Sequence, residues 1–325
     1  MRIAIIGCGL IGQKRAATLG EHSLVVCCDI DANKAAKLAS TSDGAEATTD
    51  WQPVMARADV NAVIICTTHD MLASIAECAA LQGKHALIEK PGARRAEELE
   101  PVVRAAEKTG VVVKIGFNHR YHRAFRKARE IFDSGVLGEL FFIRARYGHG
   151  GRPGYEREWR ANPSISGGGE AIDQGMHLID LARWFMGDLK LSGGKATTYF
   201  WDMPVEDNAF FLLENERGRV AFLHSSWTEW KNMFSFEICC RKGKLEISGL
   251  GGSYGPERLA HYQMQPEMGP PPTTVYEYPM ADDSWNREFQ AFVEDIENGR
   301  ARCPGVNDAQ AALRIVERLY EGHQQ

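Results

Sequence analysis

Short apolar runs alternate with amphipathic stretches along the first third of the chain. The runs are four to seven residues long, as in buried strands, and the stretches between them have the period of a helix. This alternation predicts a doubly wound parallel sheet. Strands are expected at residues 3–6, 24–28, 62–66, 85–88 and 111–117, and helices at 32–40, 71–82 and 96–109, after a first helix that begins near residue 11.

The pattern changes character after residue 118, which marks a domain boundary. Further apolar runs follow at short spacing with turns instead of helices between them, and this predicts strands of one antiparallel sheet. We therefore expect two domains, residues 1–118 and 119–325. In the second domain, strands are expected at residues 140–147, 209–213, 220–224, 234–239 and 244–247, and helices at 121–134, 285–298 and 308–320.

A glycine motif follows the first predicted strand. Gly7, Gly9 and Gly12 form GxGxxG, in which the first glycine allows a tight turn, the second lets the backbone approach a pyrophosphate and the third lets helix and strand pack closely. The second strand ends at Asp29, where a carboxylate can bind a ribose 2′-hydroxyl. We predict a dinucleotide site; the alternative is a packing turn with Asp29 as a helix cap. NAD is expected over NADP, because Asp29 would repel a 2′-phosphate and residues 30–33 contain no Arg.

The expected parallel strands end in small or polar residues, and ligands of open α/β sheets bind outside these ends. Lys90 is the obvious cation there apart from Arg120. It follows a buried strand and precedes Pro91, which stiffens the backbone, so a directed role is expected instead of that of a solvated loop lysine. The expected cofactor-binding residues are Gly7, Gly9, Leu10, Ile11, Gly12, Asp29, Thr67, His69, Glu89 and Lys90.

The stretch GGGEAIDQGMHLID, residues 167–180, places Asp173 and His177 four residues apart at the start of an expected helix. Residues at this spacing share one helical face. A histidine with a carboxylate one turn away can accept a proton from a substrate hydroxyl. The alternative is a polar pair at the end of an amphipathic helix. That alternative suits the pair taken alone, and the cofactor motif in the same chain favours catalysis.

A long segment without a predicted element, residues 148–168, precedes this helix. Its aromatic and Arg content argues against disorder and favours a loop that covers the substrate. Arg suits a carboxylate or phosphate group on that substrate. The alternative is local ion pairing with Glu156 and Glu158. The residues that suggest binding are Arg152, Tyr155, Arg157, Trp159 and Arg160.

Composition narrows the possible partners and compartment. The net charge of −5 gives no basic field for nucleic acid, and no apolar run approaches the roughly 20 residues of a membrane helix. The eight cysteines include no CxxC and no zinc-site spacing, so we expect reduced thiols and no metal. With a first strand that begins at Arg2, the protein is expected to be cytoplasmic.

Four motifs together resemble the Gfo/Idh/MocA oxidoreductase family. They are GCGLIG at residues 7–12, EKP at 89–91, GFNHRY at 116–121 and DQGMH at 173–177. The resemblance covers nearly the whole chain and implies an α/β protein: an N-terminal Rossmann doubly wound parallel sheet plus a C-terminal α/β domain with a large open, mostly antiparallel sheet.

The resemblance also implies nicotinamide-dependent chemistry on sugars, cyclitols or their derivatives. Lys90 matches the lysine that contacts substrate and nicotinamide, Asp173 the substrate-binding aspartate and His177 the catalytic histidine. One departure is Thr67-Thr68-His69, where many members have Thr-Pro-Asn. This difference affects the expected cofactor contacts after the fourth strand.

We therefore expect an enzyme that transfers a hydride between NAD(H) and a CH-OH or ketone carbon of a sugar, cyclitol, sugar acid or nucleotide sugar. His177 would take the hydroxyl proton, Asp173 would orient His177 or the substrate, and Lys90 would stabilise the alkoxide. The alternatives are an NAD-dependent hydrolase or lyase that acts on a glycoside through transient oxidation, and a nucleotide sensor. The expected substrate-binding residues are Lys90, Asn118, Arg120, Arg152, Tyr155, Trp159, Arg160, Asp173 and His177.

Residues 209–213 are apolar without the alternation of a strand that has one face in water. We therefore expect self-association through the exposed face of the C-terminal sheet, as a homodimer or homotetramer. The family resemblance implies the same.

Overall fold

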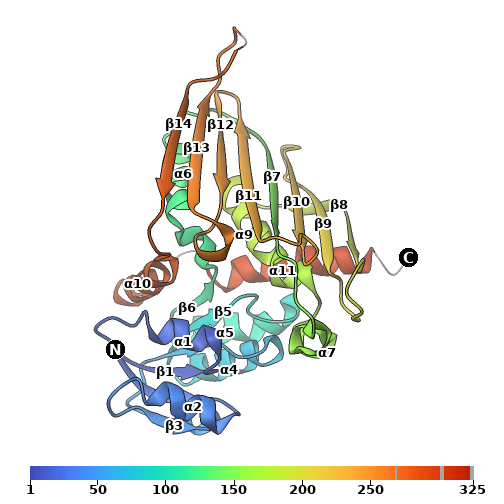
Figure 1. Cartoon of the computed structure of the whole chain (residues 1–325). Coiled ribbons are helices and arrows are strands. Elements are labelled where there is room, and N and C mark those ends of the chain that lie inside the picture. Colours follow the sequence, from blue (N-terminus) through green and yellow to red (C-terminus); the bar gives the residue numbers. More distant parts are fainter. Residues whose placement is uncertain (268, 301–303, 323–325) are drawn as a thin grey trace. The chain divides into compact units, whose positions relative to one another are not determined.

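The structure, a computed structural model, describes residues 1–267, 269–300 and 304–322 (Figure 1). The chain forms two compact units. The first contains Met1–Phe117, Ser164–Gly167 and Trp285–Leu313, and the second contains Asn118–Pro163, Gly168–Ser284 and Arg314–Gln325. The segment Trp285–Leu313, which the sequence groups with residues 119–325, thus belongs to the first unit.

A six-stranded sheet forms the centre of the first unit. Its order is β3-β2-β1-β4-β5-β6, and every pairing is parallel. The short strand β3 and helix α3 were not predicted, because neither is marked by an apolar run. The elements are β1 (Arg2–Ile6), α1 (Leu10–Ala16), β2 (Ser23–Cys28), α2 (Ala32–Ala39), β3 (Glu46–Thr48), α3 (Gln52–Met55), β4 (Ala62–Ile65), α4 (His69–Leu81), β5 (His85–Glu89), η1 (Ala96–Leu99), α5 (Glu100–Thr109) and β6 (Val113–Gly116).

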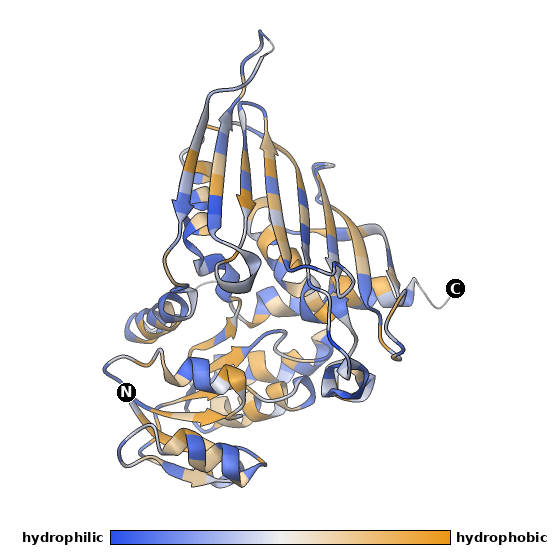
Figure 2. Ribbon diagram, in the orientation of Figure 1, coloured by the Kyte–Doolittle hydropathy of each residue, from blue (hydrophilic) through white to orange (hydrophobic). Residues whose placement is uncertain are grey.

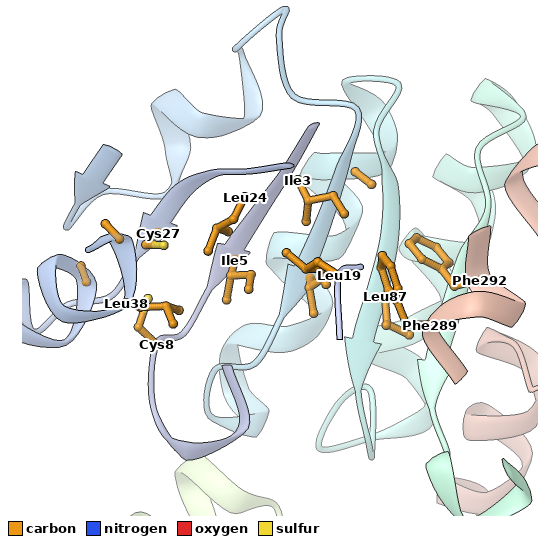
Figure 3. Close-up of a cluster of buried hydrophobic side chains, with 14 of the residues drawn as sticks. Ile3, Ile5, Cys8, Leu19, Leu24, Cys27, Leu38, Leu87, Phe289 and Phe292 are labelled. Carbon is orange, nitrogen blue, oxygen red and sulfur yellow. The ribbon is translucent and has the colours of Figure 1, made fainter. Parts of the chain in front are cut away.

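The core of this unit includes side chains from far along the sequence. Helix α10 (Ser284–Glu297) contributes Phe289 and Phe292, which are buried with Ile3, Leu19 and Leu87 in one cluster (Figure 3). Parallel sheets need cover on both faces, and the apolar side of an amphipathic helix provides it. This packing explains why the segment after residue 284 joins the first unit.

An eight-stranded sheet forms the second unit, in the order β14-β13-β12-β11-β7-β10-β9-β8. Strands β7 and β10 are parallel and the other neighbours antiparallel. The predicted fold class is therefore confirmed, although β8, β13 and β14 were missed because glycine or polar residues interrupt their apolar pattern. The strands are β7 (Leu140–Gly148), β8 (Lys190–Thr197), β9 (Asn208–Glu214), β10 (Val220–Ser226), β11 (Met233–Cys240), β12 (Gly243–Ser248), β13 (Glu257–Gln263) and β14 (Thr273–Tyr278).

Helices and short 3-10 turns complete the second unit. The turn η2 (Asn118–Tyr121) leads into α6 (Arg123–Asp133), and α8 (Glu170–Asp173) leads into α9 (Gly175–Met186). The remaining elements are η3 (Tyr155–Arg157), η4 (Trp159–Ala161), α7 (Pro163–Ser166), η5 (Gly252–Tyr254) and α11 (Val306–Glu321), of which α7 and α11 have residues in both units.

Alternation along the strands gives this sheet two different faces, visible as bands of apolar and polar residues in Figure 2. On the inner face, Phe236 contacts Phe125 of α6 and Phe185 of α9. The outer face carries Phe142, Leu212 and Phe222, which are 36%, 40% and 46% exposed. Leu212 and Phe222 are direct cross-strand partners. The outer face thus has an apolar patch on adjacent strands.

A buried ion cluster connects three elements of the first unit. Arg15 of α1 is fully buried and lies 2.5 Å from Glu89 of β5 and 2.6 Å from Glu288 of α10. Its guanidinium also lies 4.4 Å from the centre of the Trp285 ring. One cation faces two carboxylates. Burial raises the pKa of Glu288 to about 7, with Arg15 opposing the rise and the charge of Glu89 adding to it.

This cluster predicts a pH dependence of stability. The folded protein holds the Glu288 proton up to about pH 7, whereas the ordinary value is 4.5. The free energy of unfolding should therefore decrease as the pH rises from 4.5 to about 7. Glu288→Gln has no carboxyl group to titrate at this position, so this contribution to the decrease should be absent. Urea unfolding at several pH values measures it, with Glu297→Gln on the exposed side of the same helix as control. Parallel pH profiles for wild type and Glu288→Gln would contradict the prediction.

Candidate functional site

The turn at residues 7–12, called the glycine turn below, is constrained on one side and open on the other. A Cβ on Gly7, whose φ is +95°, would lie 2.4 Å from the carbonyl oxygen of Cys66, and a Cβ on Gly12 would lie 2.0 Å from that of Gly7. At Gly9, no heavy atom of the described residues lies within 4 Å of the Cβ position. Packing explains the first and third glycines, while the space at Gly9 fits the approach of a pyrophosphate.

Asp29 holds the glycine turn in place. Its Oδ2 accepts a hydrogen bond of 2.7 Å from the backbone N–H of Cys8, and its Oδ1 accepts one of 2.9 Å from Asp31. A carboxylate has about four lone-pair positions, so these two bonds leave capacity for a ribose hydroxyl. Asp29 is half-buried at the end of β2, as a residue that shapes the turn and contacts a dinucleotide would be.

Other expected cofactor residues have partners within the first unit. The Nδ1 atom of buried His69 lies 2.7 Å from the carbonyl oxygen of Ser166, and Thr67 donates to the carbonyl oxygen of Thr68. The carboxylate of Glu89, which is expected to contact the cofactor, accepts a hydrogen bond from Arg15. The sequence hid this pairing because the partner lies 74 residues away. Leu10 and Ile11 begin α1 at the open turn, and Lys90 is half-buried directly after β5.

The sequence predicts that Asp173 and His177 share one helix, but in the structure they lie on two. Asp173 ends α8 and His177 lies in the first turn of α9, with Gln174 between the two helices. The N–H of His177 donates to the carbonyl oxygen of Gln174, three residues back, so the turn is tighter than in an α-helix. Both side chains are nevertheless buried, and the two residues lie on either side of Gly175, where α9 begins.

Arg160 is an ionic partner of Asp173. Its Nε lies 3.3 Å from Oδ2 of Asp173, and its guanidinium lies 4.5 Å from the centre of the Trp159 ring. Burial disfavours the guanidinium charge, but Asp173, together with Tyr155 and Glu158, outweighs this effect, and the pKa of Arg160 is raised. The pair therefore keeps Asp173 facing a positive charge contributed by the segment before α7.

Aromatic rings surround His177. The imidazole of His119 stacks on that of His177, with 3.7 Å between ring centroids and 26° between planes. Tyr147 of β7 lies 6.2 Å from His177 and 5.3 Å from His119, and its other neighbour is Tyr254 of η5 at 5.2 Å. His119 belongs to the GFNHRY motif but was not assigned a role. No sequence motif marks Tyr147 or Tyr254, because only the folding of the second unit brings them close to the two histidines.

Two expected substrate residues have internal partners. Arg120 makes a bidentate pair with Asp180 of α9, with distances of 2.8 Å and 2.6 Å, and both side chains are buried. Its Nε and one terminal nitrogen therefore donate to a carboxylate of the same unit, and the expected substrate role of Arg120 stays a prediction. Asn118 is buried and donates from Nδ2 to Oγ of Ser284 at 3.0 Å.

The Arg-rich segment, residues 148–168, is more structured than predicted. It contains η3, η4 and α7. Tyr155 packs edge-on against Trp227 at 4.6 Å in a buried cluster with Val205, and its expected contact with substrate stays a prediction. Arg152 pairs with Glu158, and Arg157 with Glu156, as local ion pairs. Arg160 reaches the buried carboxylate of Asp173.

No group of three or more His, Cys, Asp or Glu in residues 1–267, 269–300 and 304–322 is arranged to hold a metal ion. Over the same described residues, no helix has the length and apolar character to cross a bilayer.

A parallel sheet with an open glycine turn, joined in one chain to a mostly antiparallel sheet with a buried Asp and His, defines a dinucleotide-dependent oxidoreductase of two domains. Residues 1–117 match the family model described as "Oxidoreductase family, NAD-binding Rossmann fold", and residues 125–246 match the "GFO/IDH/MocA C-terminal domain". The chain belongs to the Gfo/Idh/MocA oxidoreductase family. The predictions of this family, of an enzyme and of NAD as cofactor are confirmed.

Individual relatives are distant. The chain is 25% identical to D-glucoside 3-dehydrogenase of Escherichia coli, over 99% of this chain and 95% of that protein. It is 26% identical to levoglucosan dehydrogenase of Pseudarthrobacter phenanthrenivorans, a match that covers 67% of this chain and 59% of that protein. A solved structure of levoglucosan dehydrogenase in complex with NADH and levoglucosan matches with a TM-score of 0.87 at 22% identity, covering 99% and 97% of the two chains, which shows the shared fold.

The two arginine positions give a matched test. Arg160→Ala should remove a charge-assisted hydrogen bond to buried Asp173 and raise KM for the best substrate by about tenfold or more. Arg152→Ala should leave KM unchanged, because its ion pair with Glu158 is exposed at the arginine. Steady-state kinetics on both variants measure this, with thermal unfolding to confirm folding. If both variants kept the wild-type KM, the segment would be structural.

Proposed function

We propose that the protein is an NAD-dependent dehydrogenase that interconverts a CH-OH group and a ketone on a sugar, cyclitol, sugar acid or nucleotide sugar. One observation carries this proposal: a buried histidine, His177, follows a buried aspartate with its own cation in a chain that also has an NAD-binding turn. The names of the glucoside and levoglucosan dehydrogenases support a sugar-like substrate.

Each residue has a distinct proposed role. Bound NAD supplies a hydride acceptor at C4 of the nicotinamide. His177 takes the proton of the substrate hydroxyl as general base, and Asp173, held by Arg160, orients His177 or a substrate hydroxyl. Lys90 stabilises the developing alkoxide, a role that rests on the EKP motif. The Rossmann domain would thus bind the cofactor and the C-terminal domain the substrate.

The second candidate is a hydrolase or lyase that uses NAD for transient oxidation of a glycoside. It would need the same base and cofactor, and it differs in the fate of the hydride, which returns to the substrate. A panel of sugars, inositols, sugar acids and nucleotide sugars distinguishes the two reactions. Net NADH accumulation supports the dehydrogenase, and product formation without it supports the alternative.

The role of His177 predicts a large loss of rate. His177→Gln should lower kcat by about 10²- to 10⁴-fold, the usual contribution of a positioned base, and leave the NAD affinity nearly unchanged. Lys90→Ala should also lower kcat, and the double variant should lose less than the product of both effects if they act on one hydroxyl. His224→Gln on the outer sheet face is the control. Near wild-type kcat in His177→Gln would return the Asp173 and His177 pair to a structural role.

We also propose that the outer face of the eight-stranded sheet mediates self-association into a homodimer or homotetramer. Its apolar patch and an adjacent ladder of charges support this. Arg144 and Lys244 both pair with Glu237, at 2.7 Å and 3.0 Å, across three neighbouring strands. Apolar groups flanked by ordered charges are typical of interfaces between copies of a chain.

Light scattering tests this surface. Wild type at micromolar concentration should have the mass of a dimer or tetramer, and Leu212→Glu should shift it toward a monomer, because the new charge would be buried without a partner. Glu246→Gln, which changes the adjacent charge ladder and leaves the apolar patch intact, should have a smaller effect. A monomeric wild type would contradict the proposal.

A further inference from the structure

The face-to-face contact of His119 and His177 is the structural feature that the proposed mechanism leaves unexplained. The rings are 3.7 Å apart and 26° from parallel, and both residues are buried. A stack of this kind fixes the plane of each ring, because rotation of either would collide with the other. Burial also limits the water that would otherwise screen a charge on one ring from the other.

His119 is held from behind by its own contacts. Its Nδ1 lies 3.2 Å from Oδ1 of Asn118, whose Nδ2 donates to Ser284. His122 packs edge-on against it, with centroids 5.5 Å apart, and His122 Nδ1 lies 3.0 Å from Oε2 of Glu257. The ring of His119 is therefore a fixed surface against which His177 rests.

The charged groups around the stack already have partners. Asp173 faces Arg160, and Asp180 faces Arg120. On the far side, Glu257 and Asp282 lie near His122, at 3.0 Å and 3.7 Å. Glu170 of α8 is fully buried. Burial raises the pKa of the Tyr147 hydroxyl, and it raises the pKa of the Tyr254 hydroxyl to about 12. Both tyrosines therefore stay neutral near pH 7.

Two protonated imidazoles in such a stack repel each other, whereas one imidazolium is attracted to the face of a neutral ring. We propose that His119 is a positioning residue for His177: it holds the plane of the base and lets the pair carry one proton at a time. The catalytic importance of this pairing rests on the proposed function, but the pairing itself does not. In a working enzyme, His177 would accept the substrate proton while His119 is neutral, because a proton already on His119 would oppose the second charge.

Nuclear magnetic resonance of the imidazole rings tests the coupling without any substrate. In the wild-type protein, His177 should titrate over a broader pH range than a single independent site. In His119→Phe, which keeps a flat ring but no titratable nitrogen, His177 should show one simple step with a midpoint at higher pH. His261→Phe, a buried histidine on β13, is the control and should leave the titration of His177 unchanged.

Kinetics give the second readout. The rising limb of kcat with pH should move to lower pH in His119→Phe, because the active form no longer requires a second neutral imidazole, while kcat on its plateau stays within about threefold of wild type. His119→Ala, which also removes the supporting ring, should lower the plateau by about 10- to 100-fold with little change in KM. A plateau lost equally in the Phe and Ala variants would contradict the positioning role.

The outcomes separate this inference from the proposed function. Identical single-step titrations of His177 in wild type and His119→Phe would overturn the inference whatever the activity. If His177→Gln kept near wild-type kcat while the titration of His177 still responded to His119→Phe, the proposed function would fail and the coupled pair would stand.

Discussion

A completely buried guanidinium, that of Arg15, is the constraint on which the first unit depends. A charge in the protein interior is destabilising by several kcal/mol unless carboxylates and hydrogen bonds compensate it. Arg15 obtains this compensation from Glu89 and Glu288, and it therefore ties α1, β5 and α10 together. Helix α1 begins at the glycine turn and β5 ends directly before Lys90. The positions that would contact cofactor and substrate are thus supported by one interaction that touches neither.

The second unit follows the same principle with different partners. Buried Glu206 accepts hydrogen bonds from the backbone N–H groups of Gly169 and Ala171 and from the hydroxyl of Tyr320. These bonds fix the start of α8, and so the backbone that leads to Asp173. In both units, a buried ionisable side chain thus holds the backbone that leads to a proposed reactive residue. Preorganisation of this kind allows a base to act without a reorganisation of its surroundings.

The sequence predicted the features whose signal is local and missed those that depend on distant residues. The glycine turn, the parallel strands and the Asp173 and His177 pair all lie in short recognisable stretches. The ion pairs of Glu89 with Arg15 and of Arg120 with Asp180 were not predicted, because the partners are 74 and 60 residues apart. A buried ion pair and a binding site require the same residue types, so sequence alone does not separate them.

Tertiary packing explains the remaining differences. Tyr155 reads as an exposed aromatic in a polar loop, yet it is buried against Trp227 from another strand connection. The stack of His119 on His177 likewise joins residues 58 positions apart, as their numbers show. Each histidine lies in a motif that the sequence reveals, but the contact between the motifs exists only in the folded unit.

The passage of the chain from the second unit back to the first has a consequence for synthesis on the ribosome. All six strands of the parallel sheet leave the ribosome by residue 116, but Phe289, Phe292 and Glu288 follow much later. Until then the nascent first unit lacks part of its core and one carboxylate partner of Arg15. The first unit is therefore completed only after α10 has been synthesised, and an isolated fragment that ends at residue 118 would expose an apolar surface that favours aggregation.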